Sequence, residues 1–207
     1  MANKRCKTPY PSEETGEINV LIAGFGGQGV ISAGKILART ALHEGRHTTY
    51  FPSYGAEVRG GTAHCFVKIS DCPIDSPLIE SLDIAIILNQ PSWIKFSPKL
   101  KRGVAVVNSN LCPAVSVPRA VKLASLPLKR IAAECGDIRS ANLAALGAAQ
   151  FLDERLFREQ TLLVVLREYF SDKSIAEANQ KAFLRGRDWV LQLSEKKNLN
   201  HSPERVA

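Results

Sequence analysis

Short apolar runs alternate with segments of helical periodicity along the first two-thirds of the chain. Residues 18–23, 84–88 and 103–107 are nearly continuous apolar runs, which are typical of strands buried on both faces. Between the first two runs, the apolar positions of residues 28–44 recur with the spacing of a helix, and Gly45 stands where a helix commonly ends. Strands that alternate with helices predict an α/β fold with a mostly parallel sheet.

The other elements follow from the same patterns. Residues 62–69 alternate between apolar and polar positions, so we expect a half-buried strand that is antiparallel or near an edge. The remaining expected elements are strands at 47–51 and 121–124 and helices at 90–100, 128–135, 138–152, 159–170 and 174–193. The expected fold is a three-layer α/β/α sandwich with a mostly parallel, Rossmann-like mixed sheet and C-terminal helices packed over it.

The 207 residues fit one domain with short extensions. We expect a flexible polar leader at 1–16, a single α/β domain at 17–194 and a polar tail at 195–207. No apolar run follows the basic residues near the N-terminus, and none is long enough for a membrane span, so a cytoplasmic protein without a membrane partner is expected. The five cysteines are irregularly spaced without a C-x-x-C pair, which indicates neither a zinc site nor an iron–sulfur cluster.

The net charge of +7 adds little to this interpretation. The densest basic groups are Lys95, Lys99, Lys101 and Arg102, and later Lys122, Lys129 and Arg130. Neither group is interleaved with the aromatic residues of a platform for single-stranded nucleic acid. A solvated basic face is therefore expected, and no nucleic-acid partner.

The first segment with candidate chemistry is the glycine turn Gly24-Phe25-Gly26-Gly27-Gln28-Gly29, which follows a predicted strand and opens a predicted helix. Glycines in this context allow a tight turn, and the helix N-terminus favours an anion such as a phosphate. A dinucleotide site also needs an acidic residue near the end of the second strand, and residues 47–51 contain none. Two interpretations therefore remain open, an anion-binding turn and a turn for close packing of a helix or a subunit.

The second segment is the loop at residues 52–62, which contains Tyr54, Glu57, Arg59, Gly60 and Gly61. Arg59 is suited to bind a phosphate or carboxylate, or alternatively to form an ion pair that fixes the loop. We expect both loops to leave parallel neighbouring strands at the carboxyl edge of the sheet, to lie side by side and to form one locally positive surface.

Together, these segments resemble the gamma subunits of 2-oxoacid:ferredoxin oxidoreductases. The similarity lies in Gly-Phe-Gly-Gly-Gln-Gly-Val and Ser-Tyr-Gly-x-Glu-x-Arg-Gly-Gly-Thr-Ala, and in three later pieces that contain Asn89, Asn108 and the pair Arg139 and Asn142. The Ser-Tyr-Gly-x-Glu version of the loop resembles enzymes for 2-oxoglutarate and branched-chain 2-oxoacids, although Ala56 replaces the proline common there.

The resemblance implies a division of labour within a larger enzyme. Thiamine diphosphate and magnesium sit between alpha and beta subunits, iron–sulfur clusters sit on a delta subunit or elsewhere, coenzyme A accepts the acyl group and ferredoxin takes the electrons. A gamma-type chain then has no catalytic residue, binds no cofactor or metal alone and serves assembly. The alternatives are a free-standing Rossmann-type dinucleotide-binding oxidoreductase, which lacks its ribose-binding acid here, and a pure scaffold.

Overall fold

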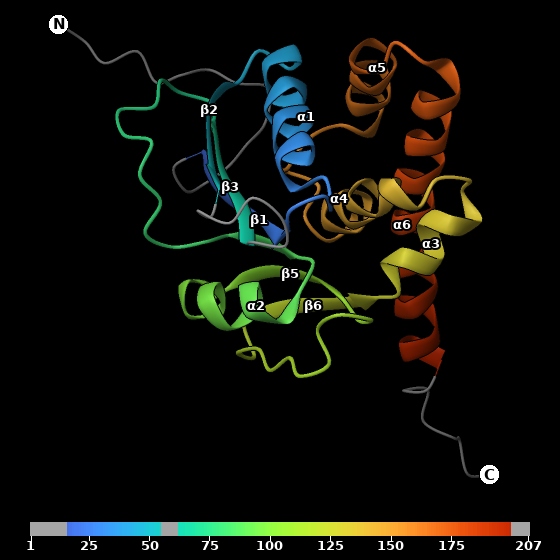
Figure 1. The fold of residues 1–207 in the computed structure, drawn as a ribbon. Helices are drawn as coiled ribbons and strands as arrows, with labels where there is room; N and C mark the ends of the chain where they lie inside the picture. The colour runs from blue at the N-terminus through green and yellow to red at the C-terminus, as the bar shows by residue number, and fades with distance from the viewer. Residues whose placement is uncertain (1–15, 55–61, 200–207) are drawn as a thin grey trace, which may run out of the picture.

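A mixed six-stranded sheet organises the fold (Figure 1). The computed structural model describes residues 16–54 and 62–199. The strands are β1 (Glu17–Phe25), β2 (His47–Tyr54), β3 (Thr62–Ser70), β4 (Ile84–Ile87), β5 (Gly103–Asn108) and β6 (Val121–Leu126). The helices are α1 (Val30–His43), α2 (Gln90–Phe96), η1 (Ser97–Lys99), α3 (Leu128–Glu134), η2 (Ile138–Ser140), α4 (Ala141–Leu152), α5 (Glu159–Tyr169) and α6 (Lys173–Leu199).

The strand order is β2-β3-β1-β4-β5-β6, and the last four strands in this order are mutually parallel. Strand β3 is antiparallel to both of its neighbours, β1 and β2. The expectation that β1 and β2 are neighbours is therefore wrong. The chain turns back after β2 into the antiparallel β3, and this strand takes the place beside β1 that a parallel second strand would hold.

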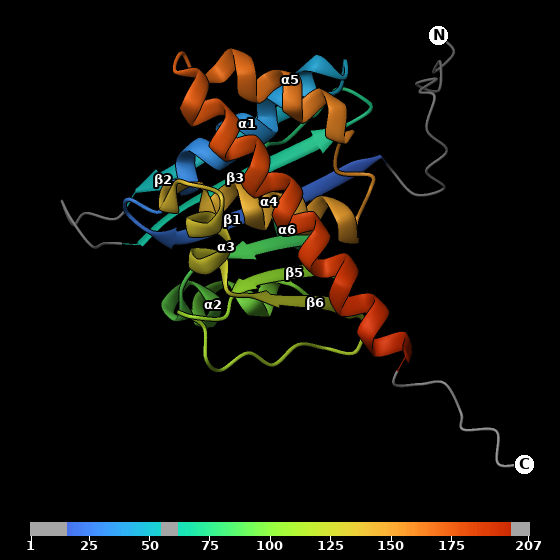
Figure 2. The same ribbon diagram turned by 90° about the vertical axis from the view of Figure 1, so that its right-hand side faces the viewer.

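Helices cover the two faces of the sheet unequally. On one face, α1 and α4 lie against the strands and α3, α5 and α6 lie outside them, with α6 running diagonally across α4 (Figures 1 and 2). On the other face lies the short α2, over a smaller cluster that contains Trp93 and Phe96. The α/β class, the mixed sheet and the C-terminal helices are confirmed, with the second outer layer reduced to α2 and its connections.

The element boundaries differ from the sequence patterns mainly at element ends. Helix α6 continues to Leu199, six residues beyond the predicted end at residue 193, although residues 195–207 were expected to form a polar tail. The predicted helix at 138–152 divides into η2 and α4, because Asp137 accepts a hydrogen bond from the backbone of Arg139 and starts a separate turn. None of the described helices is long and apolar enough to cross a membrane.

A largely buried arginine ties the start of β2 to two other parts of the fold. The Nε of Arg46 lies 3.0 Å from Oδ1 of Asp71, and the exposed fractions of the two side chains are 11% and 12%. Its Nη1 donates to the carbonyl oxygens of Arg155 and Leu156, at 2.9 and 3.1 Å. The guanidinium thus joins β2, the end of β3 and the segment between α4 and α5.

Replacement of Arg46 by methionine is expected to lower the free energy of unfolding by about 2–4 kcal/mol, because it removes the largely buried ion pair with Asp71 and the two hydrogen bonds to the carbonyl oxygens of Arg155 and Leu156. Urea unfolding measures the change. Arg130→Met is a matched control, since Arg130 is 70% exposed and its solvent-screened pair with Glu134 should contribute little to stability. Equal losses in the two variants would contradict the buried role of Arg46.

Candidate functional site

The carboxyl edge of the parallel strands gathers most of the sequence-predicted site residues that the structure describes. The glycine turn follows β1, Asn89 follows β4, and Asn108 ends β5. Tyr54 and Thr62, which flank the undescribed residues 55–61, lie at the same edge, since Thr62 pairs with Phe25. Glu57, Arg59, Gly60 and Gly61 lie outside the described residues, so their roles, and the positive charge expected from Arg59, stay predictions.

The carboxamide of Gln28 folds back into the glycine turn. Its Oε1 accepts a hydrogen bond from the backbone N–H of Phe25 at 2.6 Å, and its Nε2 lies 3.5 Å from the carbonyl oxygen of Leu88. The side chain therefore spans from the end of β1 to the end of β4. It takes up the Phe25 N–H, so this backbone donor of the turn is satisfied within the chain.

Two glycines of the turn are required by close approach. A Cβ at Gly24 would lie 2.9 Å from the Cβ of Leu88 and would collide with Gln28. Gly29 has a φ of 69°, and a Cβ there would collide with the carboxamide of Asn142. The Nδ2 of Asn142 donates to the Gly29 carbonyl oxygen at 2.8 Å, so the first turn of α4 is fastened to the start of α1.

The remaining predicted residues at this edge divide into exposed and buried positions. Gly26 and Gly27 are exposed at the tip of the turn, and space is open around Gly27. Asn89 is fully buried, caps α2 by accepting a hydrogen bond from the Ser92 N–H at 2.9 Å, and leaves its Nδ2 without a partner. Asn108 is also buried and holds the following turn. From buried positions, these two amide side chains thus hold the start of α2 and the turn after β5 in place.

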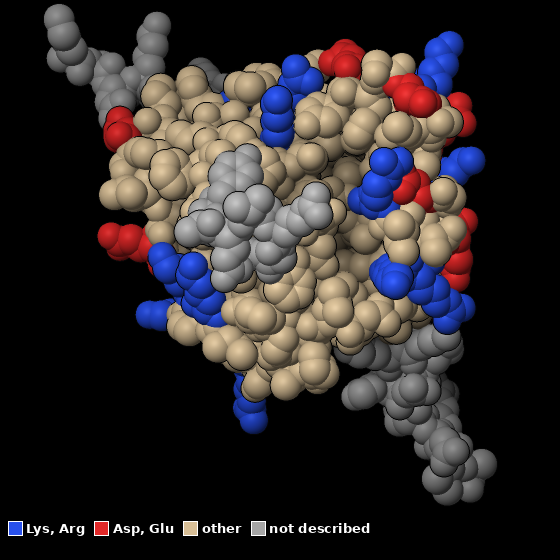
Figure 3. All heavy atoms as spheres, in the orientation of Figure 1, with Lys and Arg blue, Asp and Glu red and all other residues tan. Residues whose placement is uncertain are grey.

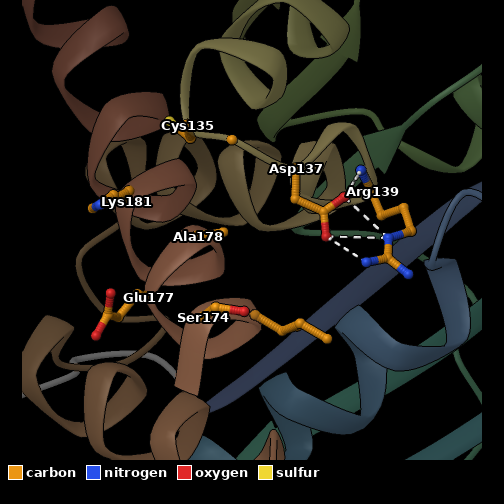
Figure 4. Close-up of a pocket in the computed structure, with 9 residues that line it drawn as sticks. Cys135, Asp137, Arg139, Ser174, Glu177, Ala178 and Lys181 are labelled. Atoms are coloured by element: carbon orange, nitrogen blue, oxygen red, sulfur yellow. Dashed lines mark hydrogen bonds and ion pairs between the residues drawn. The ribbon is translucent and has the colours of Figure 1, made fainter. Parts of the chain in front are cut away.

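Arg139 lies apart from the glycine turn, in a cavity of about 430 Å³ between η2 and the first turns of α6 (Figure 4). Asp137 and Arg139 stand on one side of this cavity, and Glu177 and Lys181 stand on α6 (Figure 4). The guanidinium makes hydrogen bonds of 2.9–3.1 Å to the Asp137 carboxylate. These bonds lower the pKa of Asp137 and raise that of Arg139.

The sequence interpretation named Arg139 without its partner. Asp137 stands two residues earlier, and an acidic residue at this spacing is the signal that would have identified the pair. The guanidinium is paired with this carboxylate in the described chain, and the role of Arg139 in a cofactor site or an interface stays a prediction. Its link to the glycine turn is indirect, through Asn142 three residues later.

The topology beside the turn differs from that of a dinucleotide site. In such a site, a parallel strand next to β1 presents an acidic residue for the ribose at its carboxyl end. Here the neighbour on that side is β3, whose amino end reaches the edge. The candidate site therefore resembles the dinucleotide fold in its turn and not in the strand that completes it.

The cysteines at or near these segments are poor nucleophiles. Burial raises the pKa of the Cys65 thiol to about 12 and that of Cys112 to about 11. Burial also raises the pKa of Cys135, which lines the cavity beside Arg139. These thiols are protonated at neutral pH and cannot act as thiolates there.

Comparison with known families agrees with this architecture. Residues 19–189 match the family described as pyruvate ferredoxin/flavodoxin oxidoreductase. The chain belongs to this family. Within it, the chain is of the gamma type: it is similar to the gamma subunit of a keto/oxoacid ferredoxin oxidoreductase from Geobacter sulfurreducens, with 30% identity and a TM-score of 0.74 over 86% of this chain and 98% of that one.

The chain is also similar to two related proteins and to one further solved structure. The ketoisovalerate oxidoreductase subunit VorA of Methanothermobacter marburgensis is 38% identical over 88% of this chain, which spans only 38% of that protein. The 2-oxoglutarate synthase subunit KorC of Methanocaldococcus jannaschii is 34% identical over 84% of this chain and 94% of its own length. The 2-oxoglutarate:ferredoxin oxidoreductase of Magnetococcus marinus, with 2-oxoglutarate, coenzyme A and succinyl-CoA bound, has a TM-score of 0.76 and 25% identity over 94% of this chain and 33% of that chain.

Proposed function

We propose that this gamma-type chain is a structural subunit of an enzyme that converts a 2-oxoacid, coenzyme A and oxidised ferredoxin into acyl-CoA, carbon dioxide and reduced ferredoxin. Its partners are then alpha, beta and delta subunits, with ferredoxin as the electron acceptor of the complex. Thiamine diphosphate, magnesium and the iron–sulfur clusters belong to the other subunits. Cys65, Cys112 and Cys135 carry free thiols, which fits the reducing cytoplasm in which such an enzyme would work.

The construction of the glycine turn carries this proposal. Gln28 takes up the Phe25 N–H, and Asn142 takes up the Gly29 carbonyl, so the turn is held rigid by the chain itself. A pre-ordered surface with exposed Gly26 and Gly27 allows another backbone to approach closely. We therefore favour a subunit contact at this turn over a coenzyme A phosphate, and the antiparallel β3 argues further against a dinucleotide.

For the substrate we propose 2-oxoglutarate, with a branched-chain 2-oxoacid as the second candidate. The KorC relative supports the first, because this chain covers 94% of its length. The VorA relative supports the second by its higher identity of 38%. Purification of the assembled enzyme through a tag on this chain, followed by assays of ferredoxin reduction with each 2-oxoacid and coenzyme A, distinguishes them.

The full chain, purified alone, is expected to be colourless, to reduce no ferredoxin and to bind neither NAD(H) nor NADP(H). The cysteines include no C-x-x-C pair for an iron–sulfur cluster. The glycine turn is filled by the Gln28 side chain and lies next to an antiparallel strand, which disfavours a nucleotide. Absorption spectra and fluorescence titrations measure these properties. An iron–sulfur absorption band, or saturable nucleotide binding in the micromolar range, would support the free-standing oxidoreductase instead.

Gly26→Val should leave folding intact and weaken association with the other subunits at least about tenfold, which corresponds to roughly 1.4 kcal/mol. Gly26 is exposed and its φ lies outside the left-handed region, so valine strains the chain little but blocks close approach. Size-exclusion chromatography of the reconstituted enzyme measures assembly, with Lys129→Val at an exposed position of α3 as the control. If assembly and the KM for coenzyme A both stay unchanged, the turn serves internal packing alone.

A further inference from the structure

The face of the β2–β3 hairpin that points away from α1 carries an exposed aromatic side chain. Phe51 of β2 pairs with Phe66 of β3, so the two side chains stand on the same face of the sheet. Phe66 packs against the cluster under α2, which lies on the side opposite α1. Phe51 is 60% exposed and lies on the edge strand of the sheet.

Two further rings extend this aromatic surface from Phe66 toward α2. The ring centroid of Phe66 lies 5.5 Å from that of His64 and 6.1 Å from that of Phe96, in edge-to-face arrangements. The His64 centroid lies 4.9 Å from that of Phe96. Burial, together with the charge of Lys95, lowers the pKa of His64, so the imidazole is neutral at pH 7 and belongs to the aromatic surface.

Lysine ammonium groups stand over these rings. The Nζ of Lys95 lies 5.0 Å from the Phe96 ring centroid, and the Nζ of Lys99 lies 5.8 Å from that of Phe66. Lys99 also donates a hydrogen bond of 3.3 Å to the Ile79 carbonyl oxygen. The exposed Lys101 and Arg102 follow, and Lys and Arg gather at the lower left of the molecule, over the end of α2 (Figure 3).

These cations have no opposite charge within the described chain. Among residues 16–54 and 62–199, no carboxylate lies within 4 Å of Lys95, Lys99, Lys101 or Arg102, whereas Arg139 and Arg155 each form an ion pair with a neighbouring aspartate. The basic group at the end of α2 was expected to lack interleaved aromatic residues. In the fold, β3 brings the Phe66 ring to 5.8 Å from the Nζ of Lys99, and Phe51 of β2 pairs with Phe66.

We propose that Phe51, His64, Phe66, Lys95 and Lys99 form an aromatic–lysine patch that docks a carboxylate-rich surface of another subunit of the same enzyme. The proposal rests on the proposed function, since it names a second contact of this subunit within the assembly. Charge complementarity selects the partner, because unpaired lysines held over aromatic rings attract carboxylates. The exposed Phe51 supplies the apolar centre that a protein interface needs. Phe51 lies on an open edge strand, which a broad protein surface can cover but which does not enclose a small anion.

Lysine acetylation of the assembled enzyme and of the full free chain tests the proposal. The acetylation rate of Lys95 and Lys99 is expected to fall at least fivefold on assembly, while Lys129 and Lys173, which are exposed on other elements, keep their rates. A carbodiimide, which joins amines to carboxylates in direct contact, should link Lys95 or Lys99 to an Asp or Glu of another subunit. Equal rates of all four lysines, or links within this chain alone, would overturn the proposal.

Charge reversal separates this patch from the glycine turn. The double variant Lys95→Glu/Lys99→Glu should lower the fraction of this chain in the assembled enzyme at least tenfold and more strongly at low salt, whereas Lys129→Glu/Lys173→Glu should not. If other subunits co-purify with the charge-reversed chain as with the native one, the patch is not an interface although the proposed function stands.

If no subunit co-purifies with the native chain, the proposed function itself fails. Protection of Lys95 and Lys99 in the free chain by ATP alone would assign the patch to a nucleotide instead and would also overturn the proposal.

Discussion

Replacement of Gly186 by alanine is expected to destabilise the protein by about 3 kcal/mol or more, a large share of the stability of an ordinary domain. A Cβ at this position would collide with the backbone carbonyl oxygen of Ala144, and one at Gly147 would collide with that of Phe183. The two glycines thus let α4 and α6 cross at the distance of backbone contact. Because backbone atoms cannot rotate away as a side chain does, the helices must separate to admit a methyl group.

Helix propensity makes this prediction sharp. Alanine is the better helix former by about 1 kcal/mol, so without the collision Gly186→Ala would stabilise the protein. Thermal unfolding should show a melting temperature lower by roughly 6–12 °C, with Gln192→Ala on the exposed side of α6 as the unaffected control. An unchanged or raised melting temperature would mean that the helices do not cross this closely.

Replacement of Gly29 by alanine is expected to cost about 2–4 kcal/mol and to disrupt the candidate interface. The left-handed backbone, with a φ of 69°, costs about 1–2 kcal/mol for a residue with a Cβ, and the collision with Asn142 adds a packing penalty. Displacement of Asn142 breaks its bond to the Gly29 carbonyl and frees the first turn of α4. Urea unfolding and the yield of assembled enzyme measure the two effects.

Gly27 provides the matched control for Gly29. Its φ of 89° is also left-handed, but a Cβ there would have no atom within 4 Å. Gly27→Ala should therefore cost the backbone strain alone. In a double-mutant cycle, Asn142→Ala should recover part of the loss caused by Gly29→Ala, since it removes the colliding carboxamide. If the losses of stability in Gly29→Ala and Asn142→Ala are additive in the double variant, or if Gly27→Ala and Gly29→Ala lose equal stability, the contact with Asn142 does not contribute.

Local patterns were sufficient for the elements of this fold. The apolar runs at 84–88 and 103–107 could be assigned because a strand buried on both faces needs apolar residues at successive positions. The alternation at 62–69 likewise indicated a half-buried strand that is antiparallel or near an edge, and β3 is antiparallel to both of its neighbours. Strand pairing is less accessible to such patterns. The order that places β3 between β1 and β2 depends on a non-local hydrogen-bonded ladder that leaves no periodicity in either strand.

The candidate site shows the same division between local and distant effects. The sequence by itself determined the glycine turn, its place between a strand and a helix, and the family, because a tight turn and a helix start are decided by neighbouring residues. Only the tertiary structure decided that Gln28 reaches the Leu88 carbonyl, that Asn142 fastens the turn and that Phe66 lies under Lys99. Most of these contacts join residues far apart in the chain, and which distant side chains meet is settled by the packing of the whole sheet and its helices rather than by any local preference.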